Sequence, residues 1–547
     1  MLAIQVIVFF VFVGMTTVSA GRASARPGGS EIPKVAGAGD ERCDLLKYAD
    51  FSAVDDAPTE VTASEFVQAA GGLPSFCRVR GYVAPNTGFE LRLPTTAWNG
   101  KFFYAGCTGH CGIAGGSSWT KECDYPLIKG YACIVSDLGH IGSPSDGLWA
   151  YRNLDAKVDF AFRATHRSAE SGKAITQAFY ESVPDRSYYM GCSTGGRQGL
   201  VSAQRFPWDF DGIIVGAPVV SQAGTSMDFI WNLQAMADDS GAPVFSMEAL
   251  KLLHESALKA SDADDGLTDG VIGDPRSSTF DPQALLCSAG QNSDCLTAAQ
   301  VSAAEKIYMG PASSQGRKLY PGAGLKAGSE AGWSGFFPAM GDRGPAGKSG
   351  IDSMRYMVTD WGPDWKTGDF DFDRDYKRLG EGESLYSAGD PDLREFKAAG
   401  GKLMLYQGWA DPIIAPMNSV DYYELVERTM GGRAQTEDFF RLFMVPGMNH
   451  CFGGKGAFAI DYITAMEAWV EEDIEPDMLE AAHLKGEHDA SSMIRVFPMD
   501  RELQLFTRPV FPYPYRARYR GTGDPDRAAS FDRVAGQAVP GTADRSP

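Results

Sequence analysis

Positive charge is scarce in this chain. Its 547 residues include 50 Lys and Arg but 70 Asp and Glu, a formal net charge of −20 at pH 7. Nucleic acids and anionic lipids are bound by clustered Lys and Arg, so we expect neither as a partner. The remaining composition, with 44% hydrophobic and 22% charged residues, is that of a soluble globular protein. The length suits several domains, or one core with large insertions.

Long apolar runs are also missing, except at the start. Residues 2–18 are almost wholly apolar and are followed by Ser19 and Ala20, a pattern typical of signal-peptidase cleavage. We predict a signal peptide at 1–20, a flexible leader at 21–42, and a secreted or periplasmic protein with no membrane partner after cleavage. The run carries no Lys or Arg, so an uncleaved membrane anchor is the alternative, although the run is short for a span.

Cysteine is not scarce: the chain has ten. An even number in an exported protein predicts disulfide bonds, although spacing does not fix which cysteines pair. For four of them, zinc binding is an alternative and three disulfide pairings are open. These four are Cys107, Cys111, Cys123 and Cys133.

A glycine-flanked serine lies at 188–200, where a short apolar strand runs into a helix-like segment. Gly191, Ser193 and Gly195 spell G-x-S-x-G, which in α/β-hydrolases forms a sharp turn that exposes the serine oxygen. The next backbone amide, of Thr194, can then face an oxyanion. An ordinary Gly-rich turn gives the same pentapeptide, so its context decides between the two.

The pattern around the serine favours a doubly wound, mostly parallel α/β sheet. Alternating segments at 77–83 and 89–94 predict antiparallel strands, and apolar runs at 101–105, 131–137 and 212–218 predict buried strands, with a helix at 159–180. Periodicity then weakens until a strand at 401–406. We therefore predict an α/β-hydrolase catalytic domain at 43–218 and 398–547, with an inserted lid domain at 219–397.

Two further residues complete a candidate triad. Asp411 and His450 each follow a predicted strand, so serine, acid and histidine occur in the α/β-hydrolase order. Asp137 and Asp373 are weaker candidates for the acid. The glycine cluster at 106–116 follows an early strand, where we expect a second oxyanion donor at Gly109.

Two cysteines adjoin this triad. Cys192 directly precedes Ser193, and Cys451 directly follows His450. A bond between them would hold the two catalytic loops together, and chain-entropy models assign such a long closure about 5 kcal/mol as an upper figure. Two unrelated buried thiols are the alternative.

An acidic loop at 262–275 lies within the predicted lid. Its aspartates would repel one another unless a hard cation neutralised them, and Ca²⁺ binds oxygen ligands on such loops. The spacing is not that of an EF-hand, and a solvated acidic turn is the alternative. The aspartates are Asp262, Asp264, Asp265, Asp269 and Asp274.

Several motifs together resemble the tannase and feruloyl esterase family, which also contains the mono(hydroxyethyl) terephthalate hydrolase. They are G-C-S-T-G-G-R-Q at 191–198, Q-R-F-P-W-D-F-D-G at 204–212, M-R-Y-M-V at 354–358, W-A-D-P at 409–412, V-P-G-M-N-H-C at 445–451, F-P-Y-P at 511–514 and Y-R-G-T-G-D at 519–524. The resemblance implies a secreted ester hydrolase with a Ser-His-Asp triad, a neighbouring cysteine bridge and structural calcium in the lid.

The resemblance also implies particular residues. Calcium ligands map to side chains of Asp262, Asp265 and Asp269 and to main-chain oxygens of Leu267 and Val271. Further bridges map to Cys287 with Cys295 and to Cys43 with Cys77. Two cysteine positions that usually brace the calcium loop are Ser261 and Ser278 here, and another pair is replaced at Phe511 and Arg533. We therefore expect a calcium loop that depends unusually on its metal.

The predicted reaction is transfer of an acyl group from an aromatic ester to water, through an acyl-enzyme on Ser193. Candidates for contact with the aromatic group are Phe336, Phe337, Arg355 and Tyr356, although such aromatics also occur in ordinary cores. The sequence leaves feruloyl, galloyl and terephthaloyl esters open. Two rival interpretations are a peptidase on the same fold and a calcium-dependent, non-catalytic binding protein.

Overall fold

Nine strands form one sheet in the computed structural model, which describes residues 32–35, 39–114, 118–238, 240–291, 293–336, 345–486 and 501–536. The predicted signal peptide at 1–20 lies outside the described residues, as does most of the leader predicted at 21–42. Within the described ranges, no helix is both long and apolar enough to cross a membrane.

The sheet has the order β1-β2-β3-β5-β4-β6-β7-β8-β9. Its first strands pair antiparallel, and the strands from β5 to β9 run parallel. The bounds are β1 (Thr59–Val67), β2 (Phe76–Val83), β3 (Thr87–Pro94), β4 (Lys101–Ala105), β5 (Ala132–Ser136), β6 (Arg186–Cys192), β7 (Gly212–Gly216), β8 (Lys402–Gly408) and β9 (Phe440–Val445). This mostly parallel sheet confirms the predicted fold class.

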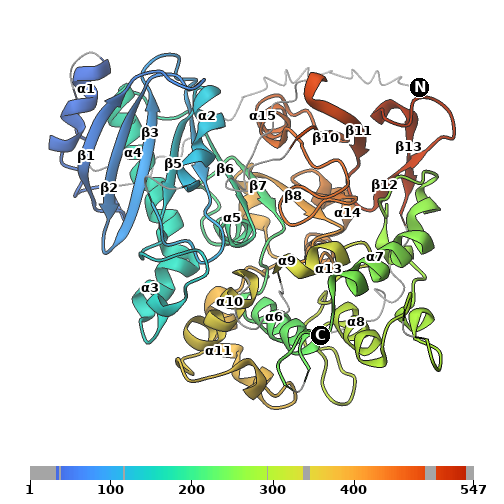
Figure 1. The fold of residues 1–547 in the computed structure, drawn as a ribbon. Coiled ribbons are helices and arrows are strands. Elements are labelled where there is room, and N and C mark those ends of the chain that lie inside the picture. Colours follow the sequence, from blue (N-terminus) through green and yellow to red (C-terminus); the bar gives the residue numbers. More distant parts are fainter. Residues whose placement is uncertain are drawn as a thin grey trace, which may run out of the picture.

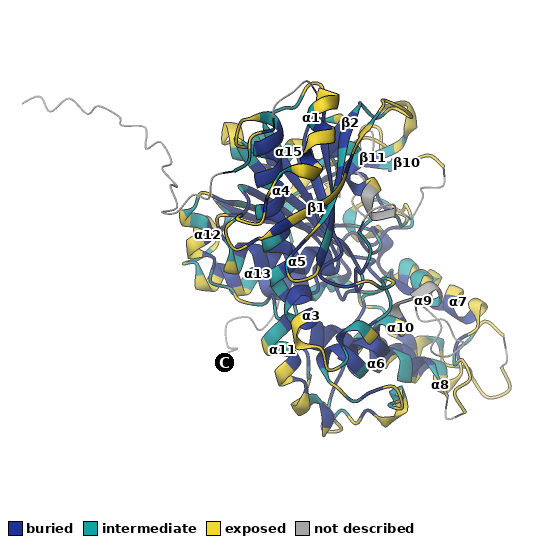
Figure 2. Cartoon of the chain, turned by 90° about the vertical axis from the view of Figure 1, so that its left-hand side faces the viewer, coloured by how far each residue is buried: buried dark blue, intermediate teal, exposed yellow. Residues whose placement is uncertain are grey.

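Helices cover both faces of the sheet, as parallel strands require. One face packs against α4 (Ala164–Tyr180), α5 (Thr194–Arg205) and α13 (Met417–Thr429), and the other against α2 (Asp124–Ile128) and α15 (Tyr462–Glu472). Figure 2 shows the strands buried between these layers. The remaining helices outside the predicted lid are α1 (Gly39–Leu45), α3 (Leu154–Val158) and α14 (Arg433–Glu437), and α12 (Arg394–Ala398) lies at the end of the predicted lid.

The helix predicted at 159–180 has two parts. Asp159–Arg163 is π-helical, and α4 begins only at Ala164. In the widened turn, the carbonyl oxygens of Phe160 and Ala161 accept hydrogen bonds from the buried Arg197 guanidinium, at 2.6 and 2.8 Å. Arg197 thereby joins this turn to α5, the helix that follows the serine.

Between β7 and β8 the chain forms a helical layer, the predicted lid. It packs around two apolar clusters of its own, which include Trp333 and Met354, and Figure 1 shows it below the sheet. Its helices are α6 (Gln222–Met236), α7 (Met247–Ser261), α8 (Ala298–Met309), α9 (Trp333–Phe336), α10 (Pro345–Asp352) and α11 (Gly380–Tyr386).

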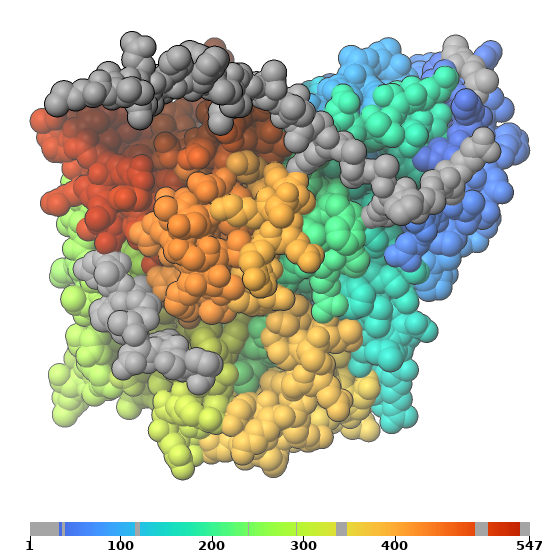
Figure 3. All heavy atoms as spheres, turned by 180° about the vertical axis from the view of Figure 1, so that it is seen from behind, coloured from blue at the N-terminus to red at the C-terminus, as the bar shows by residue number. Residues whose placement is uncertain are grey.

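The C-terminal part adds two small antiparallel sheets. β10 (Leu479–Leu484) pairs with β11 (Gln504–Val510), and β12 (Tyr515–Tyr519) pairs with β13 (Phe531–Ala535). Seen from behind, this red segment lies on the opposite side of the molecule from the blue N-terminal strands (Figure 3). It borders the acidic loop, because β12 contacts the turn at Asp262–Asp265.

Candidate active site

Ser193 occupies the turn between β6 and α5. Its backbone has φ 62° and ψ −122°, a left-handed φ that a non-glycine residue adopts only when its surroundings enforce it. The turn is held by the Ser193 amide, which donates to the Gly216 carbonyl at 2.9 Å. It is also crowded: a side chain at Gly191 would place Cβ 2.7 Å from the Gly195 carbonyl carbon. The glycines of the motif are therefore sterically required.

Asp411 and His450 meet at the carboxyl ends of β8 and β9. His450 Nδ1 lies 2.8 Å from Asp411 Oδ2, and the aspartate is fully buried. Asp411 also accepts hydrogen bonds from the Ile413 and Ile414 amides, at 2.8 and 2.9 Å, and from Gln407 Nε2 at 2.9 Å. Four donors thus fix the carboxylate. Gln407, a polar residue inside an apolar strand, is a member of this site that the sequence analysis did not identify.

The two predicted oxyanion donors lie side by side. Thr194 Oγ1 donates to the Gly109 carbonyl oxygen at 2.6 Å, which ties the start of α5 to the loop after β4. Within the described part of the chain, neither the Thr194 amide nor the Gly109 amide donates a hydrogen bond. Thr194 is the first residue of a helix, where amides have no partner within the helix. Both amides are therefore available to a ligand.

Disulfide bonds join all ten cysteines. The structure pairs Cys192 with Cys451, whose Cα atoms are 6.0 Å apart across a sequence separation of 259, so the serine and histidine loops are covalently linked. Cys107 and Cys111 close the loop that carries Gly109. The four cysteines with open pairing therefore form disulfides in place of a zinc site. The other pairs are Cys43–Cys77, Cys123–Cys133 and Cys287–Cys295.

A cavity of about 240 Å³ brings these groups together beneath the lid. Ser193 and His450 line it with Thr194 and Gly109, at the carboxyl ends of parallel strands where open α/β sheets bind ligands. The opposite wall comes from the lid, and most of it is apolar or uncharged. The other lining residues are Thr108, His110, Pro144, Ser145, Val219, Gln222, Thr225, Ser226, Phe229, Ser349, Gly350, Ser353, Ile413 and Ile414.

Two of the predicted contacts for an aromatic group, Arg355 and Tyr356, do not line this cavity. Arg355 is not among the lining residues, and its guanidinium donates to the Trp365 carbonyl at 2.9 and 2.7 Å. Tyr356 is buried against Tyr151, with ring centroids 5.5 Å apart, and does not line the cavity either. Phe337 and the side chain of Phe336 lie outside the described residues. Ser353, two residues before Arg355, does line the cavity and was not among the predicted contacts.

The cavity carries little charge. No Lys, Arg, Asp or Glu is among its described lining residues. Burial lowers the pKa of His110 to about 4, with the Asp352 carboxylate opposing this shift, so the imidazole is neutral at pH 7. His140 is also buried, with Nε2 2.7 Å from the His110 carbonyl oxygen. The site thus suits a neutral ligand group.

A second, larger cavity of about 390 Å³ lies between the lid and the catalytic loops. Trp409, Ala410 and Asn449 line it beside His254 and His483. It therefore adjoins the Asp411 and His450 loops without containing Ser193 or the two free amides. The reactive groups converge only in the smaller cavity among the described residues.

The acidic loop has oxygen atoms suited to binding calcium, although its carboxylates do not point to one common centre. Asp262 accepts from the Asp269 and Gly270 amides at 3.1 and 2.9 Å. Burial raises the pKa of Asp265 to about 6, and the Asp269 and Asp262 carboxylates add to the shift. Arg508 pairs with Asp269 at 2.8 Å. The carboxylates and carbonyls are hard oxygen ligands that fit Ca²⁺; binding through Asp269 would require it to leave Arg508.

The missing cysteine bridge has a polar counterpart. Ser261 Oγ donates to Ser278 Oγ at 2.7 Å, so the two positions where the family resemblance implies a bridge are adjacent here. This hydrogen bond joins the residue before the acidic loop to the residue that follows the next short helix.

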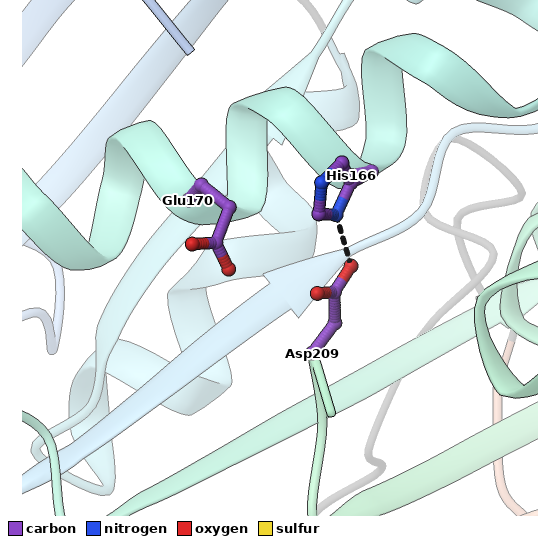
Figure 4. Close-up of side chains that lie close together, drawn as sticks. All are labelled: His166, Glu170 and Asp209. Carbon is purple, nitrogen blue, oxygen red and sulfur yellow. Dashed lines mark hydrogen bonds and ion pairs between the residues drawn. The ribbon is translucent and has the colours of Figure 1, made fainter. Parts of the chain in front are cut away.

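One other cluster has closely spaced ligand atoms. His166, Glu170 and Asp209 place them within 4.8 Å of one another, the one such group of three found in the described ranges. Figure 4 shows His166 and Glu170 on α4 facing Asp209. His166 Nδ1 lies 2.8 Å from Asp209 Oδ2, its ring stacks on Phe206, and Lys173 lies 3.6 Å from Glu170. Because cations of the protein already pair with these carboxylates, the cluster is a structural ion-pair network.

Comparisons with known proteins agree with this architecture. Residues 70–534 match the family model described as tannase and feruloyl esterase. The chain is 33% identical to an uncharacterized esterase of Xanthomonas campestris, covering 89% of this chain and 90% of that protein. It is also 33% identical to the mono(2-hydroxyethyl) terephthalate hydrolase of Piscinibacter sakaiensis, covering 86% of each. The crystal structure of feruloyl esterase B from Aspergillus oryzae matches with a TM-score of 0.74 and 28% identity, over 87% of this chain and 97% of that one.

Proposed function

Because this chain belongs to the tannase and feruloyl esterase family, whose model spans residues 70–534, we propose that it hydrolyses esters of aromatic acids through a Ser-His-Asp acyl-enzyme. Ester hydrolysis of the tannase and feruloyl esterase type is the activity of its family and of its named relatives. Four further parts belong to the proposal: Ser193 as the nucleophile, an aromatic acyl group in the substrate, a bound calcium ion and export of the protein.

The observation that carries the proposal is the position of His450. Asp411 fixes its ring, and the ring lines the same cavity as Ser193. Because Nδ1 faces Asp411 at 2.8 Å, Nδ1 carries the proton and Nε2 is left as the base. His450 takes the Ser193 hydroxyl proton as Oγ attacks the ester carbonyl, and then returns it to the leaving alcohol. Water repeats the cycle on the acyl-enzyme, while Asp411 stabilises the imidazolium that forms.

The oxyanion of each tetrahedral intermediate is assigned to the Thr194 and Gly109 amides. Their freedom from other partners supports this role, because a donor already committed to a carbonyl would have to break that bond first. Each such donor typically contributes about 3 kcal/mol to the transition state. The Thr194 hydroxyl, bonded to the Gly109 carbonyl, keeps the two amides in register.

An aromatic acyl group fits the lid side of the cavity. Val219, Phe229, Ile413 and Ile414 give it an apolar wall, and the volume of about 240 Å³ suits one substituted ring. The name of the Piscinibacter relative makes a terephthalate monoester the second candidate substrate. A non-catalytic binding protein is disfavoured by a complete set of triad residues around one pocket.

Hydrolysis assays with the purified full chain test the proposal. Methyl ferulate, methyl gallate and mono(2-hydroxyethyl) terephthalate should be compared with amides of the same acids. We expect turnover of at least one ester and at least a hundredfold slower cleavage of its amide. Failure to cleave any of the three esters would refute the aromatic ester assignment, and comparable amide cleavage would favour the peptidase interpretation.

Two further features belong to this proposal. We assign calcium to Asp262, Asp265 and Asp269 with the Leu267 and Val271 carbonyls, where it would neutralise the buried charge and brace the lid without taking part in the reaction. We also propose export. The five disulfides support it, because such bonds persist in oxidising compartments.

A further inference from the structure

Gln222 introduces an amide into the uncharged lid wall of the active-site cavity. It is the first residue of α6, is only 5% exposed and lines the cavity that contains Ser193. Its Nε2 donates to Ser353 Oγ at 3.0 Å. Ser353 lies on the neighbouring π-helical turn, and its hydroxyl is 3.2 Å from His110 Nε2. The amide nitrogen is therefore held by Ser353, whose hydroxyl also contacts His110.

The carbonyl oxygen of the same amide has no partner. Gln222 Oε1 is buried and accepts no hydrogen bond from the described residues. An acceptor left unpaired in an apolar setting is costly, and native proteins rarely tolerate one without a reason. Gln222 lines the cavity, so a side-chain rotation on binding would bring this buried oxygen within reach of a donor on the ligand.

The charge of the cavity restricts what that ligand group is. Its described lining residues include no Lys or Arg, and His110, with its pKa lowered to about 4 by burial, is uncharged at neutral pH. A carboxylate on the acyl ring would be desolvated without a counter-charge and would face the Gln222 carbonyl oxygen. A ring hydroxyl needs no counter-charge and can donate.

We propose that Gln222, positioned by Ser353, is a specificity residue that accepts a hydrogen bond from a phenolic hydroxyl of the acyl group, so that the enzyme prefers hydroxylated aromatic esters over monoesters of aromatic dicarboxylic acids. The inference rests on the proposed function and narrows its acyl group. Gln222 selects among acyl groups and takes no part in bond making.

A pair of matched esters isolates this hydrogen bond. Methyl caffeate and methyl cinnamate differ only in two ring hydroxyls, and the ratio of their kcat/KM values cancels general effects on catalysis. We expect Gln222→Leu to lower this ratio about tenfold relative to the wild type, the effect of one lost hydrogen bond. Ser353→Ala, which frees the amide to rotate, should lower the ratio by a smaller factor.

The control is Gln234→Leu on the same helix. Gln234 donates to the Thr367 and Phe370 carbonyls, at 2.7 and 3.2 Å, and is not among the residues that line the cavity. Its substitution should leave the ratio unchanged. Thermal unfolding of each variant confirms folding, and Gln222→Met replaces Gln222→Leu if the latter does not fold. An equal ratio in wild type and Gln222 variants, or an equal drop in Gln234→Leu, would overturn the assignment.

A second pair tests the carboxylate. Dimethyl terephthalate and monomethyl terephthalate differ in one negative charge, and we expect wild type to cleave the neutral diester at least tenfold faster. A monoester cleaved as fast as the diester would overturn the proposed preference. If wild type cleaves none of these aromatic esters, the proposed function fails and this inference falls with it. If it cleaves both cinnamates but the ratio ignores Gln222, the function stands and only the inference is lost.

Discussion

Asp411 and Asp228 are both buried, but their surroundings differ sharply. Asp411 follows β8 at the edge formed by the carboxyl ends of the parallel strands, called the catalytic edge below, and Asp228 lies in the lid. Asp411 receives four hydrogen bonds from Ile413, Ile414, Gln407 and His450. Asp228, on α6 and only 2% exposed, has an oxygen, Oδ1, with no partner in the described residues. Burial raises its pKa to about 7, and the nearby Lys326 only partly offsets this shift.

The contrast separates two roles. The catalytic edge is built from short loops at strand ends, so its polar atoms are fixed by backbone amides before any substrate arrives. The lid is built from helices that are far apart in the sequence and are brought together by the packing of their side chains. It leaves polar atoms unpaired, such as Gln222 Oε1 and both side-chain ends of Asn232. We expect changes at the edge to abolish chemistry, and changes in the lid to alter selectivity and stability.

The largest effect is expected at Ser193, the proposed nucleophile. Ser193→Ala should reduce kcat for any substrate by more than a thousandfold, because only binding and the oxyanion donors would remain. The variant should unfold at nearly the same temperature as the wild type. Retention of more than about a thousandth of wild-type activity would show that another group attacks the ester.

The disulfides allow the two regions to be compared directly. Replacing Cys192 and Cys451 by alanine should cost up to about 5 kcal/mol in unfolding free energy, because this bond closes a loop of 259 residues. Activity should fall as well, since the bond holds the His450 loop against the Ser193 loop. Denaturant unfolding and steady-state kinetics measure the two effects.

The lid bridge is the matched control. Cys287 and Cys295 are eight residues apart, and the same chain-entropy relation gives about 2 to 3 kcal/mol for their removal. Activity per folded molecule should stay close to wild type. Equal losses of activity from the two double variants would remove the distinction between edge and lid.

Calcium should affect the lid more than the chemistry. Chelation should lower the melting temperature, and added Ca²⁺ should restore it. When free Ca²⁺ exceeds its Kd a hundredfold, binding should raise the free energy of unfolding by about 3 kcal/mol. Activity should fall only gradually. Calorimetry and metal analysis of the purified protein decide the matter: an unchanged melting temperature with no bound metal would leave a solvated acidic turn. Asp265→Asn should reduce the change in melting temperature that calcium causes. Ser261→Cys with Ser278→Cys should stabilise the metal-free protein, so that chelation lowers its melting temperature less.

The sequence was informative where local chemistry determines structure. The G-x-S-x-G turn and the apolar runs of β4 to β9 predicted the sheet, and Asp411 and His450 followed from strand ends. It was poorly informative in the lid, where weak periodicity concealed the helices α6 to α11. Gln222 and Ser353 are neighbours only because the fold places α6 beside a turn 131 residues away. No local signal marks such a pair, so the sequence did not identify either residue.

The smallest effect concerns Asp228 itself and depends on pH. Its pKa is raised from the usual 3.8 to about 7 in the folded protein, so the neutral form suits its site. The stability associated with that form is fully present below the unfolded pKa and is lost as pH rises through about 7. Asp228→Asn stays neutral, so it should lose less stability than wild type as the pH rises from 4 to 8, with little difference between the two proteins at pH 4. Melting temperatures of both proteins across this range provide the test.

Asp411→Asn serves as the contrast, because it would lose the charge that pairs with His450 and should cost activity at every pH. Parallel melting curves for wild type and Asp228→Asn would mean that Asp228 is solvated or paired, and the lid would then resemble the catalytic edge more closely than its contacts indicate.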